Sequence, residues 1–324
     1  MRSTPIPHTD LTPSAICLGS SNFGNGIPPA DAYALMDTYV TCGGNFIDTA
    51  AVYANWLPGE KNSSEKTIGR WLARSGQRAR LVLATKGGHP DLATMHISRM
   101  SPPKIVDDVE TSLRNLQTDW IDLYWLHRDD TARPVAEIID TLHGQVVAGN
   151  IRYFACSNWR PERIAAAQAY AAQKGITGFV ANQMRWSLAA INPAAVDDST
   201  TVAMDDETYA YHKQSSLAAI PYSSQANGYF QKEAEKREVR PNQQKMYGNR
   251  ENRARGARLK KLAGETGYSI SQLVLGWLTN QPFPTIPIVG CRTVAQVEDS
   301  MTAGDVELTE AQVAWLAGGK GQIS

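Results

Sequence analysis

The sequence predicts a single α/β domain, a (β/α)8 or TIM barrel, spanning residues 1–324. Eight short apolar or β-branched runs recur along the chain, and each precedes a stretch whose apolar residues repeat every three to four positions. No Pro-, Ser- or Gly-rich linker separates these repeats. The chain also lacks the G-x-G-x-x-G fingerprint that a doubly wound nucleotide-binding fold carries after an early strand. Together these observations favour a barrel over the doubly wound fold.

The first four strand and helix units fill the N-terminal half of the chain. The predicted strands cover residues 15–19, 45–48, 81–86 and 121–127, and the predicted helices cover 30–43, 63–76, 101–116 and 134–149. Gly43 and Gly149 stand at the ends of two of these helices, where glycine commonly terminates a helix. Ser101 followed by Pro102 is a strong helix start.

The last four units follow the same order. The predicted strands cover residues 151–158, 178–183, 217–224 and 285–290, and the predicted helices cover 161–175, 205–214, 251–267 and 293–303, with an additional helix at 269–281. The most highly charged run, residues 231–261, is interpreted as a solvated loop and helix face. Its alternative interpretation is a flexible cover over cofactor phosphates, because loops after the seventh strand often bind phosphate in barrels.

Composition limits the kind of partner. Lys plus Arg and Asp plus Glu number 32 each, so no net charge draws the chain to nucleic acid or to an anionic membrane. The four cysteines form no C-x-x-C pair, which is typical of reduced thiols in a cytosolic protein without a zinc site. No run reaches the roughly 18 apolar residues of a membrane span. We therefore expect a cytoplasmic protein that acts on a small molecule without a metal, in an oligomeric state that the sequence leaves open.

Polar side chains stand where the predicted strands end, and this is the end of a barrel where chemistry occurs. Asp48, Lys86 and His127 end three consecutive strands, and Tyr53 follows the first of them. Each residue alone has an ordinary explanation, since a charged strand end is usually solvated and a lone histidine is usually structural. Four such residues converging at one mouth indicate a catalytic site.

Proton transfer to a developing alkoxide is the chemistry that suits these four residues. A phenol has a pKa near ~10, and an adjacent ammonium lowers it. Lys86 supplies that ammonium, and Asp48 keeps Lys86 protonated and in place. His127 is predicted to donate a hydrogen bond that orients and polarises a carbonyl oxygen.

Three stretches resemble the aldo-keto reductases: "GGNFIDTAAVY" (43–53), "LATKGG" (83–88) and "TSLRNLQTDWIDLYWLH" (111–127). The similarity runs through nearly the whole chain, which looks like a short-tailed, bacterial-type member. The resemblance implies a barrel enzyme that reduces aldehydes or ketones with a nicotinamide cofactor. It also implies Tyr53 as general acid, Lys86 and Asp48 as the pair that tunes its pKa, and His127 as the orienting group.

The resemblance further implies an extended nicotinamide cofactor, bound without a Rossmann domain. Its carboxamide, nicotinamide ring, pyrophosphate and adenosine phosphate would be held by residues from four later segments: Ser157 and Asn158; Gln183; Tyr222, Ser223 and Gln225; and Gly290, Arg292, Thr293 and Gln296. Because a guanidinium suits a ribose 2′-phosphate better than a 2′-hydroxyl, Arg292 favours NADPH over NADH. The usual Glu-Asn ending of this last segment reads Asp299-Ser300 here.

The substrate pocket is predicted to include Trp56, Arg128 and Trp186. Arg128 stands beside two aspartates after His127, and a polar mouth of this kind suits a sugar-derived or small hydroxylated carbonyl. The two tryptophans would wall the pocket or stack on a sugar ring, and a buried packing role explains them equally well. Because the tail beyond Ala303 is short, the loops after the strands must build most of the pocket.

Two other functions stay open at this point. One is a cofactor-binding regulatory subunit, because the β-subunits of voltage-gated potassium channels resemble the same family. The other is a Schiff-base lyase that uses Lys86 as its nucleophile.

Overall fold

The fold is the predicted (β/α)8 barrel, seen in a computed structural model that describes residues 1–319. Its eight strands are β1 (Cys17–Gly19), β2 (Phe46–Asp48), β3 (Val82–Gly87), β4 (Ile121–Leu126), β5 (Ile151–Ser157), β6 (Ala181–Gln183), β7 (Ala218–Ala219) and β8 (Ile288–Val289). Paired strands run parallel in the order β7-β6-β5-β4-β3-β2-β1-β8. The predicted domain ends at residue 324, so its last five positions lie outside the described residues.

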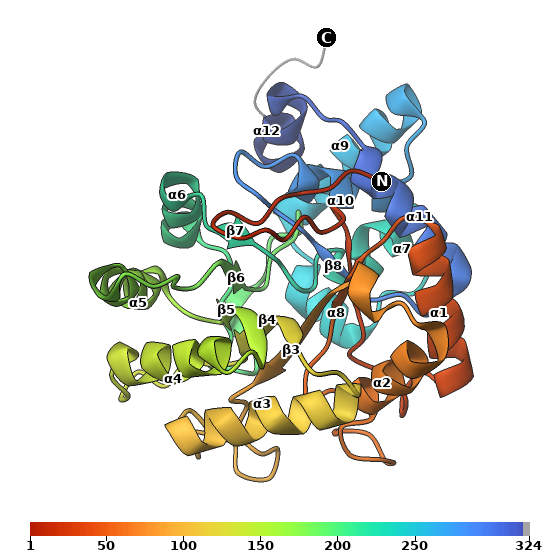
Figure 1. Cartoon of the computed structure of the whole chain (residues 1–324). Helices are drawn as coiled ribbons and strands as arrows, with labels where there is room; N and C mark the ends of the chain where they lie inside the picture. The colour runs from red at the N-terminus through yellow and green to blue at the C-terminus, as the bar shows by residue number, and fades with distance from the viewer. Residues whose placement is uncertain (320–324) are drawn as a thin grey trace.

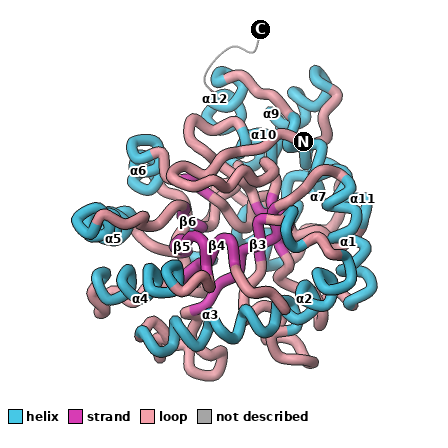
Figure 2. The backbone as a smooth tube through the Cα atoms, viewed as in Figure 1, coloured by secondary structure: helices cyan, strands magenta, loops and turns pink. Residues whose placement is uncertain are grey.

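Hydrogen bonds between β7 and the segment that leads into β8 close the sheet on itself. Ala219 and Thr285 form a parallel bridge. The Ile286 N–H donates to the Ala219 carbonyl at 2.9 Å, and the Ile288 N–H donates to the Pro221 carbonyl at 3.0 Å. Closure removes the exposed strand edges that an open sheet would present. Figures 1 and 2 show the strands at the centre of the molecule and the helices around them.

Twelve α-helices lie within residues 1–319. They are α1 (Pro29–Thr41), α2 (Ser63–Ser75), α3 (Pro102–Leu116), α4 (Val135–Val147), α5 (Pro161–Lys174), α6 (Asp206–Ser215), α7 (Tyr229–Ala234), α8 (Pro241–Tyr247), α9 (Arg250–Thr266), α10 (Ile270–Thr279), α11 (Val294–Thr302) and α12 (Glu310–Gly318). In Figure 1, β3 runs toward the lower edge of the view, and the loop between β3 and α3 lies below the barrel.

The barrel interior is packed with apolar side chains below the strand ends. Phe46, Leu123 and Trp125 are fully buried there, in one cluster with residues of all eight strand segments. Ile6 and Leu11 of an N-terminal hairpin join the same cluster. The hairpin therefore closes the amino-terminal end of the barrel and leaves the carboxyl-terminal end for the site.

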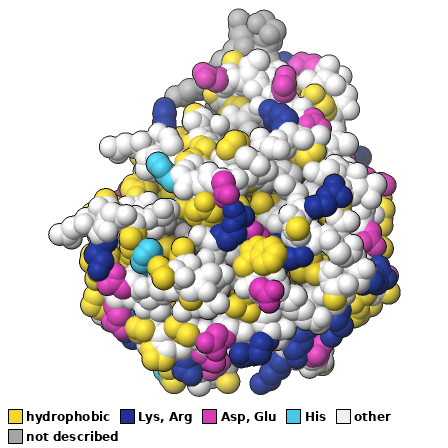
Figure 3. Space-filling model, in the orientation of Figure 1, with side chains coloured by type: hydrophobic (Ala, Val, Ile, Leu, Met, Phe, Trp, Pro, Cys, Tyr) yellow, Lys and Arg dark blue, Asp and Glu magenta, His cyan; other side chains and the backbone are white. Residues whose placement is uncertain are grey.

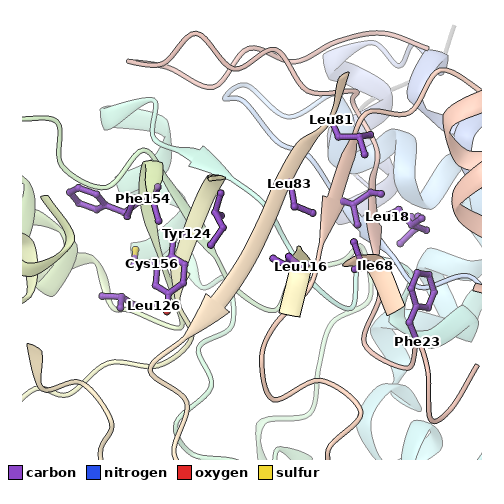
Figure 4. Packing of buried hydrophobic residues seen from close by; sticks show 14 of the residues in the cluster. Leu18, Phe23, Ile68, Leu81, Leu83, Leu116, Tyr124, Leu126, Phe154 and Cys156 are labelled. Atoms are coloured by element: carbon purple, nitrogen blue, oxygen red, sulfur yellow. The ribbon is translucent and has the colours of Figure 1, made fainter. Parts of the chain in front are cut away.

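A second apolar layer lies between the sheet and the helices. Leu83 and Tyr124 point outward from their strands, because side chains alternate between the two faces of a strand. Both are fully buried in one cluster with Ile68 of α2 and Leu116 of α3. Figure 4 shows these side chains between strands and helices. Strands buried on both faces are typical of a barrel wrapped by helices.

Two predicted strands are much shorter than the sequence pattern indicates. Strands were predicted over residues 217–224 and 285–290, but the structure has only the two-residue strands β7 and β8 there. Pro221 and Pro287 interrupt these runs, and proline cannot donate a ladder hydrogen bond.

Two short helices, α7 and α8, occupy part of the charged run that the sequence analysis treated as loop. A last helix, α12, was not predicted. Thr309 and Gln312 form a capping box at its start, and that Thr-x-x-Gln pattern could have revealed it.

The visible face of the space-filling view carries acidic and basic side chains interspersed with one another (Figure 3). Among the described residues, no helix combines the length and the apolar character needed to cross a membrane.

Candidate active site

Strand register brings the predicted catalytic residues to the inside of the barrel mouth. Asp48 pairs with Ala84, and Lys86 pairs with Trp125, so Asp48 and Lys86 continue the inward rows of their strands. His127 follows β4 directly, two positions beyond Trp125. A slip of one residue would turn Lys86 toward the helices, so the apolar alternation of each strand fixes the site.

Lys86 and Asp48 form a buried ion pair, and each is 1% exposed. The Lys86 Nζ contacts Asp48 Oδ2 and donates to the Thr49 carbonyl at 2.8 Å. The other carboxylate oxygen of Asp48 accepts from Gln183 Nε2 at 3.3 Å. Burial alone would lower the pKa of Lys86, but Asp48 and then Tyr53 outweigh it, so the pKa is raised. Lys86 is therefore a charged ammonium at neutral pH, as predicted.

Tyr53 stands in the loop between β2 and α2, above this ion pair. The Lys86 Nζ lies 4.5 Å from the centroid of the Tyr53 ring, and the His127 ring lies 5.7 Å away, centroid to centroid. Burial raises the pKa of Tyr53, and the Lys86 ammonium lowers it by less, so the net shift is upward from 10.0. The predicted lowering of this pKa is therefore wrong in sign, because the desolvation of a phenolate outweighs one nearby cation.

His127 is a neutral imidazole at physiological pH. Burial lowers its pKa well below 6.5, and Arg128, His89 and Lys86 add to that effect. Its Nδ1 is buried and has no hydrogen-bond partner within residues 1–319. The ring of His89 packs against it at 4.8 Å between centroids. A neutral imidazole keeps an N–H that can donate to a carbonyl oxygen.

These pKa shifts predict a pH profile for carbonyl reduction. Tyr53 is the predicted proton donor and must be protonated to act, and its pKa is raised above 10.0, so kcat should stay level through neutral pH and fall only in strong base. His127 adds no loss near pH 6.5, since it is already neutral there. Steady-state kcat measured across this range tests the assignment. A fall in kcat centred well below pH 10.0 would contradict the raised pKa.

A cavity of about 940 Å³ opens beside these residues and extends across the strand ends. It is lined by thirteen of the predicted site residues: Asp48, Tyr53, His127, Arg128, Ser157, Asn158, Gln183, Tyr222, Ser223, Gln225, Gly290, Arg292 and Gln296. Lys86 lies behind this lining, where it contacts Asp48. A smaller cavity of about 340 Å³ lies beside the start of β5, and its lining contains none of the predicted residues.

Asn158 connects the catalytic end to the rest of the cavity. Its Nδ2 donates to the His127 carbonyl at 3.2 Å, and its Oδ1 accepts from Tyr222 Oη at 2.8 Å and from the Val202 N–H at 3.0 Å. Asn158 has a positive φ of 62°, a conformation that asparagine tolerates better than most residues. The amide therefore already braces Tyr222 against the strand ends.

The turn between β8 and α11 contributes Arg292 to the lining of the cavity. Arg292 is exposed, and its backbone N–H donates to Gln296 Oε1 at 2.8 Å. Thr293 caps α11 by accepting from the Gln296 N–H at 3.3 Å, and it does not line the cavity. Asp299 accepts from Ser269 Oγ at 3.0 Å, which ties α11 to the start of α10. The predicted phosphate contact of Thr293 stays a prediction.

The two predicted tryptophans occupy different environments. Trp186 is 8% exposed and packs against Trp277 and Phe283, so it belongs to the core and does not line the cavity. Trp56 is 49% exposed, and its ring lies 6.1 Å from that of Tyr53. The structure therefore gives Trp186 the packing role and places Trp56 beside Tyr53, outside the lining of the cavity.

Several cavity residues were not predicted individually. Lys232, Arg237 and Arg240 line the cavity and come from the charged run between β7 and α9. The run of basic residues was visible in the sequence, but which of them face inward depends on the unpredicted helices α7 and α8. Arg185 and Asp198 also line the cavity, and their sequence context carried no signal.

Exposed apolar side chains accompany Trp56 in the loops after β2 and β3. Leu92, Met95 and Ile97 are 42%, 39% and 54% exposed, and all three belong to the loop between β3 and α3. Both loops stand at the carboxyl end of the barrel. The mouth therefore combines polar groups with an apolar rim that the sequence analysis did not predict.

A model of the aldo/keto reductase family matches residues 15–318 of the chain. The chain belongs to the aldo/keto reductase family. It is 30% identical to a norsolorinic acid reductase of Emericella nidulans, over 95% of this chain and 78% of the relative. It is 31% identical to an uncharacterized oxidoreductase of Bacillus subtilis, over 95% and 92%. A putative aryl-alcohol dehydrogenase of Saccharomyces cerevisiae is 26% identical, over 91% and 78%. This aldo/keto reductase is thus a carbonyl-reducing enzyme of the NAD(P)H-dependent type.

The cavity residues fit a nicotinamide dinucleotide. Gln183 and Ser157 offer polar groups beside the catalytic residues, and an aromatic ring follows at Tyr222. At Gly290, an added Cβ would meet nothing within 4 Å, so the backbone there leaves room for a ligand. The lining also includes the basic side chains Lys232, Arg237, Arg240 and Arg292, which suit phosphate groups. Among residues 1–319, no group of three or more His, Cys, Asp or Glu side chains is arranged to hold a metal.

Proposed function

We propose that the enzyme reduces an aldehyde or ketone to an alcohol with NADPH, and that Tyr53 donates the proton. The observation that carries this proposal is the buried Lys86–Asp48 pair beneath a protonated Tyr53, beside a neutral His127. Asp48, Tyr53 and His127 line a cavity that Arg292 also lines, and Lys86 contacts Asp48 behind that lining. This arrangement suits carbonyl reduction because it supplies a proton and a hydrogen bond at one point.

The protein residues manage the charge that develops on the carbonyl oxygen. NADPH, when bound, supplies a hydride to the carbonyl carbon and becomes NADP⁺. His127 donates an N–H to the carbonyl oxygen, and Tyr53 transfers its phenolic proton to that oxygen. Lys86 stabilises the resulting phenolate, and Asp48 holds Lys86 in place. Tyr53 is partly exposed, so water can return its proton.

Arg292 supports a preference for NADPH over NADH. Arg292 is exposed and lines the cavity, and a charge-assisted pair with a 2′-phosphate is open only to NADPH. We propose that Lys232, Arg237 and Arg240 bind the pyrophosphate of the cofactor. In this proposal the charged run 231–261 covers the cofactor phosphates, which was its alternative interpretation.

Replacing Arg292 by Gln should raise KM for NADPH by about 10- to 100-fold and leave KM for NADH nearly unchanged. Initial rates with each cofactor at a saturating carbonyl measure both constants. Arg114→Gln on the exposed face of α3 is the matched control, with no change expected. Equal increases of KM for both cofactors would contradict the assignment to the 2′-phosphate.

For the substrate, we propose a small hydroxylated or sugar-derived carbonyl. The polar wall of Arg128, Asp198 and Thr201 beside Tyr53 supports it, because it offers donors and acceptors to hydroxyl groups. A screen of NADPH oxidation with aldoses, hydroxyaldehydes, dicarbonyls and plain alkanals tests this choice. Preference for hydroxylated carbonyls is expected, and preference for plain alkanals would contradict it.

The other two functions have weaker support. The buried, charged state of Lys86 argues against a Schiff-base nucleophile, which must be a neutral amine. Steady-state carbonyl reduction by the purified protein, with no membrane partner co-purifying, would argue against the regulatory subunit. The free state of all four cysteines supports the proposed cytoplasmic location.

A further inference from the structure

Arg185 occupies a rigid position in the wall of the cavity. It lies two residues beyond β6 and lines the cavity together with Tyr53 and His127. Its backbone N–H donates to the Val202 carbonyl at 2.9 Å, and its own carbonyl accepts from the Met204 N–H at 2.9 Å. These two bonds fix the point from which its side chain extends.

The guanidinium of Arg185 has no anionic partner within residues 1–319. Its Nε is buried without a hydrogen-bond partner. Its Nη1 reaches the Sδ of Met246 at 3.9 Å, and thioether sulfur is a weak acceptor. Its Cζ lies 5.8 Å from the centroid of the Tyr222 ring. A partly buried cation without a carboxylate is costly, so this position suits an anion that arrives with a ligand.

The neighbouring arginine is already neutralised. Arg128 Nη2 lies 2.9 Å from Asp198 Oδ2, and its Nε donates to Thr200 Oγ1 at 2.7 Å. Arg128, Arg185 and Asp198 all line the cavity. Arg128 therefore has a carboxylate partner, whereas the guanidinium of Arg185 has none within residues 1–319.

A series of contacts connects Arg185 to His127. The Tyr222 ring beside it donates through its hydroxyl to Asn158 at 2.8 Å, and Asn158 donates to the His127 carbonyl at 3.2 Å. The basic groups assigned to cofactor phosphates, such as Arg292, come from the later part of the chain. The contacts through Tyr222 and Asn158 link Arg185 to His127, which the proposed function places at the substrate carbonyl.

We propose that Arg185 binds a carboxylate carried by the carbonyl substrate. This inference rests on the proposed function and narrows its substrate class to carbonyl compounds with a carboxylate group. The planar guanidinium matches a carboxylate through two parallel hydrogen bonds. The carbonyl would then meet Tyr53 and His127 while the carboxylate meets Arg185.

The test compares 4-carboxybenzaldehyde with its neutral methyl ester, together with ω-oxo acids of increasing length and the matching alkanals. The wild-type enzyme should show a higher kcat/KM for an acid than for its matching ester or alkanal, provided that the acid is long enough to reach Arg185 while its carbonyl meets Tyr53 and His127. Arg185→Met should lower the acid-to-ester ratio of kcat/KM by about 10- to 100-fold, mainly through KM. Arg185→Lys should recover part of the ratio, and the exposed Arg80→Met control should leave it unchanged.

The outcomes separate this inference from the proposed function. If the wild-type enzyme reduces the esters and alkanals with NADPH but never prefers an acid, the proposed function stands and the inference is wrong. An equal loss on acid and ester in Arg185→Met, or a weakened NADPH affinity, would also overturn it. Calorimetric titration of the enzyme with NADP⁺ and 4-carboxybenzyl alcohol gives a second readout independent of turnover. Binding that Arg185→Met abolishes supports the inference, and binding that it leaves intact contradicts it.

Discussion

Tyr53→Phe will lower kcat for carbonyl reduction by roughly 10²- to 10⁴-fold, the usual contribution of a positioned general acid. The change removes one hydroxyl and keeps the ring that packs beside Trp56 and His127. NADPH binding should be nearly unchanged, because the phenol acts on the substrate oxygen. Steady-state kcat and a fluorescence titration with NADPH measure the two effects.

Tyr170→Phe is the matched control for this change. Tyr170 stands on α5, and its hydroxyl donates to Asp140 at 2.7 Å on the exposed surface. Its loss should not alter kcat. If Tyr53→Phe keeps more than a tenth of the wild-type kcat, Tyr53 is not the proton donor.

Lys86→Met should abolish measurable reduction and also destabilise the fold. The phenolate that forms on Tyr53 would lose its neighbouring cation. Asp48 is 1% exposed and would remain buried without its partner, which typically costs about 3–5 kcal/mol. Urea unfolding measures the free energy, and NADPH oxidation measures the rate.

A double variant separates these two consequences. Lys86→Met combined with Asp48→Asn removes both charges, so most of the lost stability should return while reduction stays abolished. If Lys86→Met does not change the free energy of unfolding, Asp48 is not a buried charge that depends on Lys86. Activity in the double variant would show that the ammonium is dispensable.

The barrel and the catalytic end were predictable because both depend on local patterns. Side-chain alternation in a strand has a period of two, so the row that ends in Asp48 or Lys86 can be read directly from the sequence. Parallel strands in a barrel also end at one mouth, so residues from neighbouring strands must meet there. The 13 predicted residues that line the cavity follow from these two facts and from the family resemblance.

Features that depend on burial could not be predicted in the same way. The sign of the Tyr53 pKa shift is a balance between desolvation and the Lys86 charge, and the sequence reports only the charge. The sequence left Trp186 open between a pocket wall and a packing role, and only the structure shows that its ring packs in the core against Trp277. The sequence does not show which arginines form ion pairs, so Arg185 could be recognised as a candidate only from the structure, where it has no ion-pair partner within residues 1–319.

Reduction with NADPH deuterated at both C4 positions of the nicotinamide shows whether the hydride reaches the carbonyl carbon from the cofactor. One deuterium should appear on the carbinol carbon of the product, and Tyr53→Phe should form much less of that product. Borohydride added to the enzyme and the carbonyl substrate, in the absence of cofactor, should leave Lys86 unmodified. A product without deuterium, or a substrate trapped on Lys86, would contradict carbonyl reduction by this site.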